Sequence, residues 1–282
     1  MSLYFSCADV NIKLTGDLPS SITEDVIPYF IRKNEKVKNA VEYTFQNVAK
    51  LNVIQGTPVY YDSFRIILKE GNSEIRIFTQ GLFKNPYAIY KEIGNNKVHI
   101  QYIGAMFSAI DMRFVELLVL EKYFLTQNAL ILHGCFIEHK GKAIVFSAPS
   151  GTGKSTQGYL WTKYENAKII NGDRCVLQNK TDNIYVSGLP FCGSSTININ
   201  KTVPLCAIVI VKQAKRNFVE IPSDNESIKK IMSETTINYW NSLYVEQSLL
   251  LIENIVNKSS VFCLNCTISK EAVDVLKREI MK

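Results

Sequence analysis

Hydrophobic and polar residues alternate along much of the first third of the chain. From Tyr4 to about His99, apolar side chains recur at every second position, as in Val10, Ile12 and Leu14. This period is typical of half-buried β-strands, and turn signals such as Gly94-Asn95-Asn96 separate the segments. We therefore expect a mainly-β N-terminal domain of antiparallel strands over residues 1–107. The expected strands lie near 10–14, 41–46, 61–68, 74–78, 87–91 and 98–102.

Two features of this half depart from simple alternation. A short helix is expected over Ile22 to Phe30, opened by Ser21 and Glu24 in a capping box. Arg65 and Arg76 alternate with apolar neighbours, which favours solvated charges on a strand face. No set of residues in this half suggests catalysis.

The pattern changes at Ser108. Apolar residues over Ser108 to Gln127 follow helical spacing, and we expect a long helix that opens a second domain over residues 108–282. Beyond it, strand and helix patterns alternate, which predicts a mixed α/β (α+β) fold. Strands are expected at 130–132, 135–137, 168–170, 204–211 and 261–266, and helices at 154–164, 223–235, 240–256 and 269–281.

The clearest motif is the segment from Ala148 to Thr156, between the apolar run Ala143 to Phe146 and the helical pattern that reaches Tyr164. Glycines let backbone N–H groups approach a polyphosphate, and a helix N-terminus points further N–H groups at it. A lysine then reaches the β and γ phosphates, and a serine hydroxyl ligates Mg²⁺. The motif has Ala148 where its usual first glycine stands. The expected nucleotide-binding residues are Ser150, Gly151, Thr152, Gly153, Lys154, Ser155 and Thr156.

A carboxylate follows the next predicted strand. Lys168-Ile169-Ile170 leads into Asn171-Gly172-Asp173, and the end of this strand is where a second group on the metal side is expected. We expect Asp173 to share the metal with Ser155. The alternative is a turn aspartate that only caps the backbone after Gly172.

Composition adds few constraints. The chain has 282 residues, of which 46% are hydrophobic and 21% charged, and these values are ordinary for one large or two moderate globular domains. The net charge of +6 comes from dispersed lysines, so we expect no nucleic-acid partner. A polyanionic nucleotide is sufficient to explain this mild excess of positive charge.

The N-terminal residues and the cysteines indicate the expected location of the protein and the expected state of its thiols. Residues 1–10 do not have the pattern of a signal peptide, and no apolar run has the length of a membrane span, so a cytoplasmic protein without a membrane partner is expected. Seven scattered cysteines favour reduced thiols. Cys263 and Cys266 have the spacing of half a zinc site, but a structural site needs two more ligands.

Several short segments together resemble the catalytic domain of HPr kinase/phosphorylase, a fold similar to the nucleotide domain of ATP-dependent phosphoenolpyruvate carboxykinase. They are Leu132-His133-Gly134, the loop at 150–156, and Ile170-Asn171-Gly172-Asp173. The chain most resembles the shorter relatives found in peptide-modification settings, some of which phosphorylate a serine of a peptide. Three further matches to that subgroup are Gly188 to Gly193, Val203-Pro204-Leu205, and Leu264-Asn265-Cys266.

This resemblance implies specific roles. Asp173 would accept the proton of the attacking hydroxyl, Ser155 and the phosphates would hold Mg²⁺, and His133 would orient the carboxylate. A histidine at a strand end can also be purely structural. Where the family enzyme has a second carboxylate, this chain has Arg174, which argues against phosphorylase activity.

The expected function is an ATP- and Mg²⁺-dependent kinase acting on a serine hydroxyl of a peptide or small protein. Its expected catalytic residues are Asp173, His133 and Lys154, and its expected metal ligands are Ser155 and Asp173. The first alternative is a kinase for a small alcohol such as free serine. The second is a binding or switch module that holds ATP without turnover. An oligomer is compatible with each of these functions.

Overall fold

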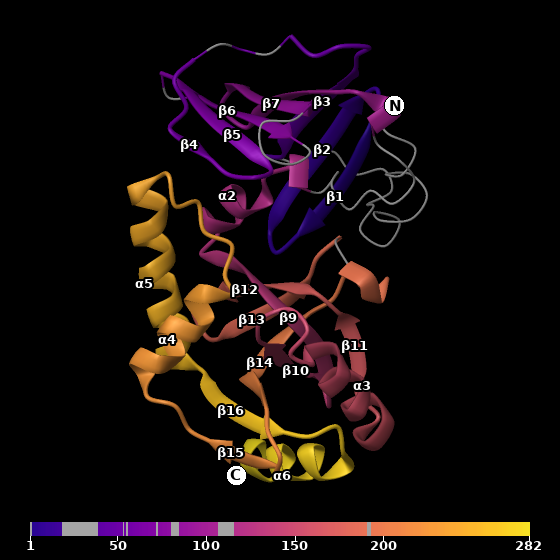
Figure 1. Ribbon diagram of the computed structural model, residues 1–282, viewed down its shortest axis with the longest axis vertical. Helices are drawn as coiled ribbons and strands as arrows, with labels where there is room; N and C mark the ends of the chain where they lie inside the picture. The colour runs from indigo at the N-terminus through magenta and orange to yellow at the C-terminus, as the bar shows by residue number, and fades with distance from the viewer. Residues whose placement is uncertain are drawn as a thin grey trace. The chain divides into compact units, whose positions relative to one another are not determined.

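The computed structural model describes residues 2–18, 39–52, 54, 56–71, 73–79, 85–106, 116–190 and 193–282. The chain forms two compact units, Met1–Leu120 and Glu121–Lys282 (Figure 1). The expected domain boundary after residue 107 and the expected helix near residues 22–30 lie outside the described residues, so both stay predictions.

The first unit contains a sheet of eight strands in the order β1-β2-β3-β8-β7-β6-β5-β4. The alternation in the sequence is the reason for these strands: in β2, Ile12 and Leu14 are fully buried while Asn11 and Lys13 are half-buried. A 3₁₀ turn, η2 (Gly104–Met106), follows the last strand. The strands are β1 (Leu3–Cys7), β2 (Val10–Gly16), β3 (Val41–Asn47), β4 (Tyr60–Tyr61), β5 (Arg65–Glu70), β6 (Ser73–Thr79), β7 (Pro86–Gly94) and β8 (Lys97–Tyr102).

The prediction that all these strands pair antiparallel is wrong. Strand β3 pairs parallel with β2 and parallel with β8, with Tyr43 opposite Leu14 on one side and Val98 on the other. Antiparallel neighbours can be joined by a tight turn, whereas parallel neighbours need a long crossover. Residues 17–40 separate β2 from β3 and are long enough for one, but periodicity does not reveal the direction of pairing.

The expectation that Arg76 is a solvated charge is also wrong. Arg76 is 1% exposed, and its Nε lies against Oε1 of Glu74, which is itself buried. From Glu74 to Thr79 every residue of β6 is buried, so both faces of this strand are covered and alternation no longer separates inside from outside. Arg65 is about one-third exposed and pairs with Asp62 at 2.9 Å.

The second unit is a mixed α/β structure of eight strands and four longer helices. Strand β10 pairs with β9 and also with β14, and β9 connects to β14 through β12 and β13, so these five strands form a closed circuit. The strands are β9 (Ala129–His139), β10 (Lys142–Ser147), β11 (Lys168–Asn171), β12 (Arg174–Asn179), β13 (Ile184–Gly188), β14 (Thr202–Gln213), β15 (Phe218–Glu220) and β16 (Ser260–Cys266).

Helices cover this unit on opposite sides (Figure 1). One apolar core joins Ile231 and Ile252 of α4 and α5 to the strands, and a second joins Trp161 and Leu276 of α3 and α6 to the other faces of the same strands. No helix among the described residues is long and apolar enough to cross a membrane. The helices are α2 (Leu120–Leu125), α3 (Lys154–Glu165), α4 (Asp224–Ser233), α5 (Ser242–Lys258) and α6 (Lys270–Ile280).

Three local predictions need correction. The long helix expected to reach Gln127 is interrupted at Val119, whose φ of 50° is left-handed, and only α2 follows. Leu117, Leu118 and Val119 are all fully buried, which a single helical stripe does not allow. Strand β9 continues through Gly134 where two separate strands were expected, and β12, β13 and β15 were not expected at all.

Gly158 sets how closely α3 approaches the sheet. A Cβ at this position would lie 2.6 Å from the Sγ of the buried residue Cys135. We predict that Gly158→Ala lowers the free energy of unfolding by about 1–2 kcal/mol, since overpacking costs about 1–3 kcal/mol and the gain in helix propensity offsets less than about 1 kcal/mol. Urea denaturation measures this change. In a protein that already carries Cys135→Ala, the loss of unfolding free energy caused by Gly158→Ala should be smaller by at least about 0.5 kcal/mol. If the effects of the two substitutions simply add, the contact between these residues is unimportant.

Candidate functional site

The segment from Ala148 to Gly153 connects the end of β10 to the start of α3, so the predicted order of strand, loop and helix is present. Gly151 has a φ of 78° and Gly153 a φ of 111°, backbone conformations that favour glycine. Gly153 stands at the N-cap of α3 and has no side chain with which to cap the helix. The first N–H groups of α3 therefore keep their capacity to bind an anion.

Lys154 is 7% exposed and folds back onto the loop. Its Nζ donates hydrogen bonds to the carbonyl oxygens of Ala148, at 2.6 Å, and Pro149, at 3.2 Å. Burial lowers the pKa of Lys154, and the carboxylates of Glu234 and Asp173 oppose this shift. The ammonium group is therefore positioned at the loop and lies within reach of two negative charges.

Ser155, in the first turn of α3, contacts the turn that follows β11. Its Oγ donates to the carbonyl oxygen of Gly172 at 3.1 Å, so the hydroxyl lies beside the turn that carries Asp173. The other predicted loop residues lie around it: Ser150 is exposed, Thr152 is half-buried, and Thr156 is half-buried in the first turn of α3.

Asn171 fixes the turn that carries Asp173. Its buried Oδ1 accepts the backbone N–H groups of Asp173, at 3.0 Å, and Arg174, at 3.1 Å. The carbonyl oxygen of Asp173 accepts the N–H of Gly134 at 2.8 Å, which ties this turn to β9. Asp173 therefore has a defined backbone position beside the strand that carries His133.

The carboxylate of Asp173 is held ionised. Burial acts to raise the pKa of Asp173, but the His133 ring, when it is protonated, and the positive charges of Arg174 and Lys154 outweigh this effect, so the pKa lies below the usual range. Nε of Arg174 lies 3.4 Å from Oδ2 of Asp173. Arg174 thus places a positive charge beside the carboxylate of Asp173.

Gly193, at the end of the segment Gly188 to Gly193, packs directly on Asp173. A Cβ on Gly193 would lie 2.6 Å from the Cβ of Asp173 and 2.9 Å from its Oδ1. Gly193 begins the short 3₁₀ turn η3 (Gly193–Ser195), while residues 191–192 lie outside the described part. Only glycine allows this close approach.

His133 lies between two carboxylates. Its Nε2 is 3.7 Å from Oδ1 of Asp173, and its Nδ1 is 3.0 Å from Oε2 of Glu234. The register of β9 and β12, which places His133 opposite Arg174, brings the histidine to Asp173. The sequence analysis missed Glu234, since it lies 101 residues from His133 at the end of α4 and belongs to no motif.

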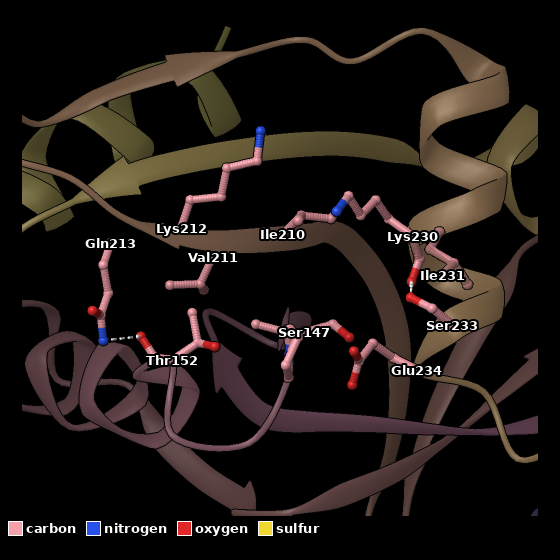
Figure 2. A pocket seen from close by; sticks show the side chains of 12 residues that line it. Ser147, Thr152, Ile210, Val211, Lys212, Gln213, Lys230, Ile231, Ser233 and Glu234 are labelled. Carbon is pink, nitrogen blue, oxygen red and sulfur yellow. Dashed lines mark hydrogen bonds between the residues drawn. The ribbon is translucent and has the colours of Figure 1, made fainter.

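A pocket of about 430 Å³ lies between Glu234 and the loop (Figure 2). Its walls come from the loop, the end of β14 and the end of α4. Lys230 extends across the pocket toward Ile210, and the carboxylate of Glu234 points toward Ser147. The lining residues are Ser147, Ala148, Pro149, Thr152, Ile210, Val211, Lys212, Gln213, Lys230, Ile231, Ser233 and Glu234.

The donor atoms suit a magnesium ion that is shared with phosphates. The Ser155 hydroxyl and the Asp173 carboxylate supply oxygen ligands, which Mg²⁺ prefers. Within the described part of the chain, no group of three or more His, Cys, Asp or Glu residues is arranged to hold a metal ion.

Comparisons with known proteins give a family match and similarities to solved structures. A solved structure described as the Hpr(Ser) kinase/phosphatase from Coxiella burnetii is 13% identical, and the alignment covers 45% of this chain and 88% of that one, with a TM-score of 0.24. A TM-score this low does not establish a common fold. No curated protein matches the sequence.

The family evidence concerns the second unit. The family model described as SynChlorMet cassette protein ScmC matches residues 105–273, a span that includes the loop, Asp173, His133 and Glu234. This span is more than half of the 282 residues. The chain therefore belongs to the family of the SynChlorMet cassette protein ScmC.

Proposed function

We propose that this chain is an ATP- and Mg²⁺-dependent kinase that transfers the γ-phosphoryl group to a serine hydroxyl of a peptide or small protein. One observation supports the proposal: a glycine-containing loop at a helix N-terminus, an aspartate with a lowered pKa and a histidine come together at one end of the strands. Phosphoryl transfer depends mainly on positioning and charge stabilisation, and these are the groups that it requires.

The loop is the proposed phosphate site. Backbone N–H groups of residues 150–156 would bind the phosphates, and Lys154 would move its ammonium from the loop carbonyls to the β and γ oxygens. Ser155 and Asp173 would hold Mg²⁺, which when bound neutralises the negative charge that builds up on the phosphates. Two loop carbonyls already hold the ammonium at this place, so only a short movement is needed.

Asp173 is the proposed proton acceptor. The acceptor oxygen forms a bond to the γ-phosphorus, the bond from that phosphorus to the bridging oxygen of ADP breaks, and its electron pair leaves with ADP. The proton of the hydroxyl goes to the Asp173 carboxylate. The low pKa of Asp173 keeps it ionised and ready to accept a hydrogen bond from the hydroxyl before the reaction.

Two other functions are alternatives to this kinase: one has a different acceptor, and the other has no turnover. A free alcohol of the size of serine would fit a pocket of about 430 Å³. A nucleotide-binding switch without turnover is favoured by the contact of Arg174 with Asp173, because Arg174 replaces a second acid with a positive charge. Screening small alcohols for transfer of label identifies the first, and binding of ATP without transfer to any acceptor identifies the second.

Lys154→Ala should weaken nucleotide binding. Loss of charge-assisted hydrogen bonds worth about 1.5–3 kcal/mol predicts roughly a 10- to 100-fold weaker affinity for Mg-ATP, measured by the rise in melting temperature on adding nucleotide. Lys163→Ala, at the other end of the same helix, is the matched control and should bind as the wild type does. Equal stabilisation of all three proteins by Mg-ATP would exclude the loop as the phosphate site.

Asp173→Asn should slow transfer strongly, whereas the loop should still bind the phosphates of the nucleotide. Removing a general base typically costs about 10²- to 10⁴-fold in rate. Label transfer from γ-labelled ATP to peptides encoded near this chain measures the rate, and Asp182→Asn, in the exposed turn between β12 and β13, is the control. If wild type and Asp173→Asn label the acceptor equally, Asp173 is not the proton acceptor.

A further inference from the structure

Glu234 is the one acidic side chain at this site that the proposed chemistry does not yet use. Its carboxylate is 12% exposed and lies 3.0 Å from Nδ1 of His133, on the side of the ring opposite Asp173. Glu234 also lines the pocket beside the loop. The histidine ring therefore stands between a carboxylate that would take part in the reaction and one that would not.

The backbone holds Glu234 in place without help from its side chain. The carbonyl oxygen of Glu234 accepts the N–H of His133 at 2.8 Å, and the N–H of Thr236 donates to the carbonyl oxygen of Ile131 at 3.0 Å. Leu132 and Thr235 form a β-bridge between these two bonds. The end of α4 is thus fastened along β9, and the Glu234 side chain is brought to the ring by main-chain contacts.

This contact decides which nitrogen of His133 carries the proton. An ionised carboxylate only accepts hydrogen bonds, so a bond from Nδ1 to Glu234 requires a proton on Nδ1. In a neutral ring the other nitrogen, Nε2, then has a lone pair. Nε2 and Oδ1 of Asp173 are 3.7 Å apart, too far for a direct hydrogen bond, so they form two acceptors side by side.

We propose that Glu234 is a positioning residue: it keeps the proton of His133 on Nδ1, so that Nε2 presents a lone pair beside Asp173 to the incoming hydroxyl. The inference rests on the kinase activity proposed above. A hydroxyl that enters between the two acceptors is drawn to this place through its proton, with its oxygen left free to attack phosphorus. A ring with the proton on Nε2 would instead present an N–H donor beside Asp173, and the hydroxyl proton would lose one of its two acceptors.

The isosteric variant Glu234→Gln tests this directly. A glutamine amide can donate to Nδ1 as well as accept from it, so the ring is free to carry its proton on Nε2. Nitrogen-15 spectra of histidine-labelled protein at pH about 9, above the ordinary histidine pKa of about 6.5, report the proton position in the neutral ring. The chain has only three histidines, and a His133→Asn variant assigns the signal.

We expect the proton on Nδ1 in the wild type and on Nε2, wholly or in large part, in Glu234→Gln. The same variant should lose roughly 10- to 100-fold in kcat, because misoriented groups cost about that much, while the apparent KM for ATP changes less than about threefold. Glu253→Gln, an exposed glutamate on α5, is the matched control and should leave both readings unchanged. Backbone amide spectra confirm that each variant is folded.

Three results would overturn the inference. The first is a proton on Nε2 of His133 in the wild type. The others are that Glu234→Gln lowers kcat without moving the proton, or moves the proton without lowering kcat. If the ring follows Glu234 as expected but the wild type transfers phosphate to no acceptor, the kinase proposal fails while the control of the ring by Glu234 stands. The two proposals can therefore fail separately.

Discussion

The backbone pairing of strand β9 determines where the functional groups of the second unit lie. Its first half pairs with β12 and its second half with β10 and β11, and His133 and Gly134 stand where the two halves meet. From this point hydrogen bonds reach the turn of Asp173 and the end of α4. Without these pairings the loop, Asp173, His133 and Glu234 would be unrelated positions, the last two of them 101 residues apart.

The rest of the unit makes this arrangement rigid. Five strands close into a circuit, and apolar cores fill the space on both sides, with α3 and α6 on one and α4 and α5 on the other. Rigid positioning is what phosphoryl transfer requires of a protein, since misplacing a group by about 1 Å can cost about 10²-fold in rate. The close contacts at Gly158 and Gly193 serve the same end, because each brings backbone against the site or its support.

Charges at the site balance locally. Lys154 and Arg174 supply positive charge, and Asp173 and Glu234 supply negative charge on either side of one imidazole. A bound polyphosphate with its metal would change this balance. The first unit has its own buried pair, Arg76 with Glu74, and removing one partner of such a pair is costly because the other charge stays buried without it.

Local sequence predicted the elements whose signals are local. Glycines, a lysine and a serine hydroxyl at fixed spacing marked the loop and helix α3, and period two marked most strands of the first unit. The helical pattern over 223–235 and the apolar run at 204–211 likewise predicted α4 and β14. Each of these signals lies within a single loop, helix or strand, so it can be recognised without knowledge of the fold.

Tertiary structure alone decided the rest. Parallel pairing of β3, burial of Arg76, and the approach of Glu234 to His133 depend on which distant segments lie side by side. Asp173 and His133 were recognisable as candidates, but only the register of β9 and β12 brings them within 3.7 Å. The spacing of side chains along the sequence reflects only the local backbone conformation. Which strands pair and which charges meet is determined instead by the free energy of packing the whole unit.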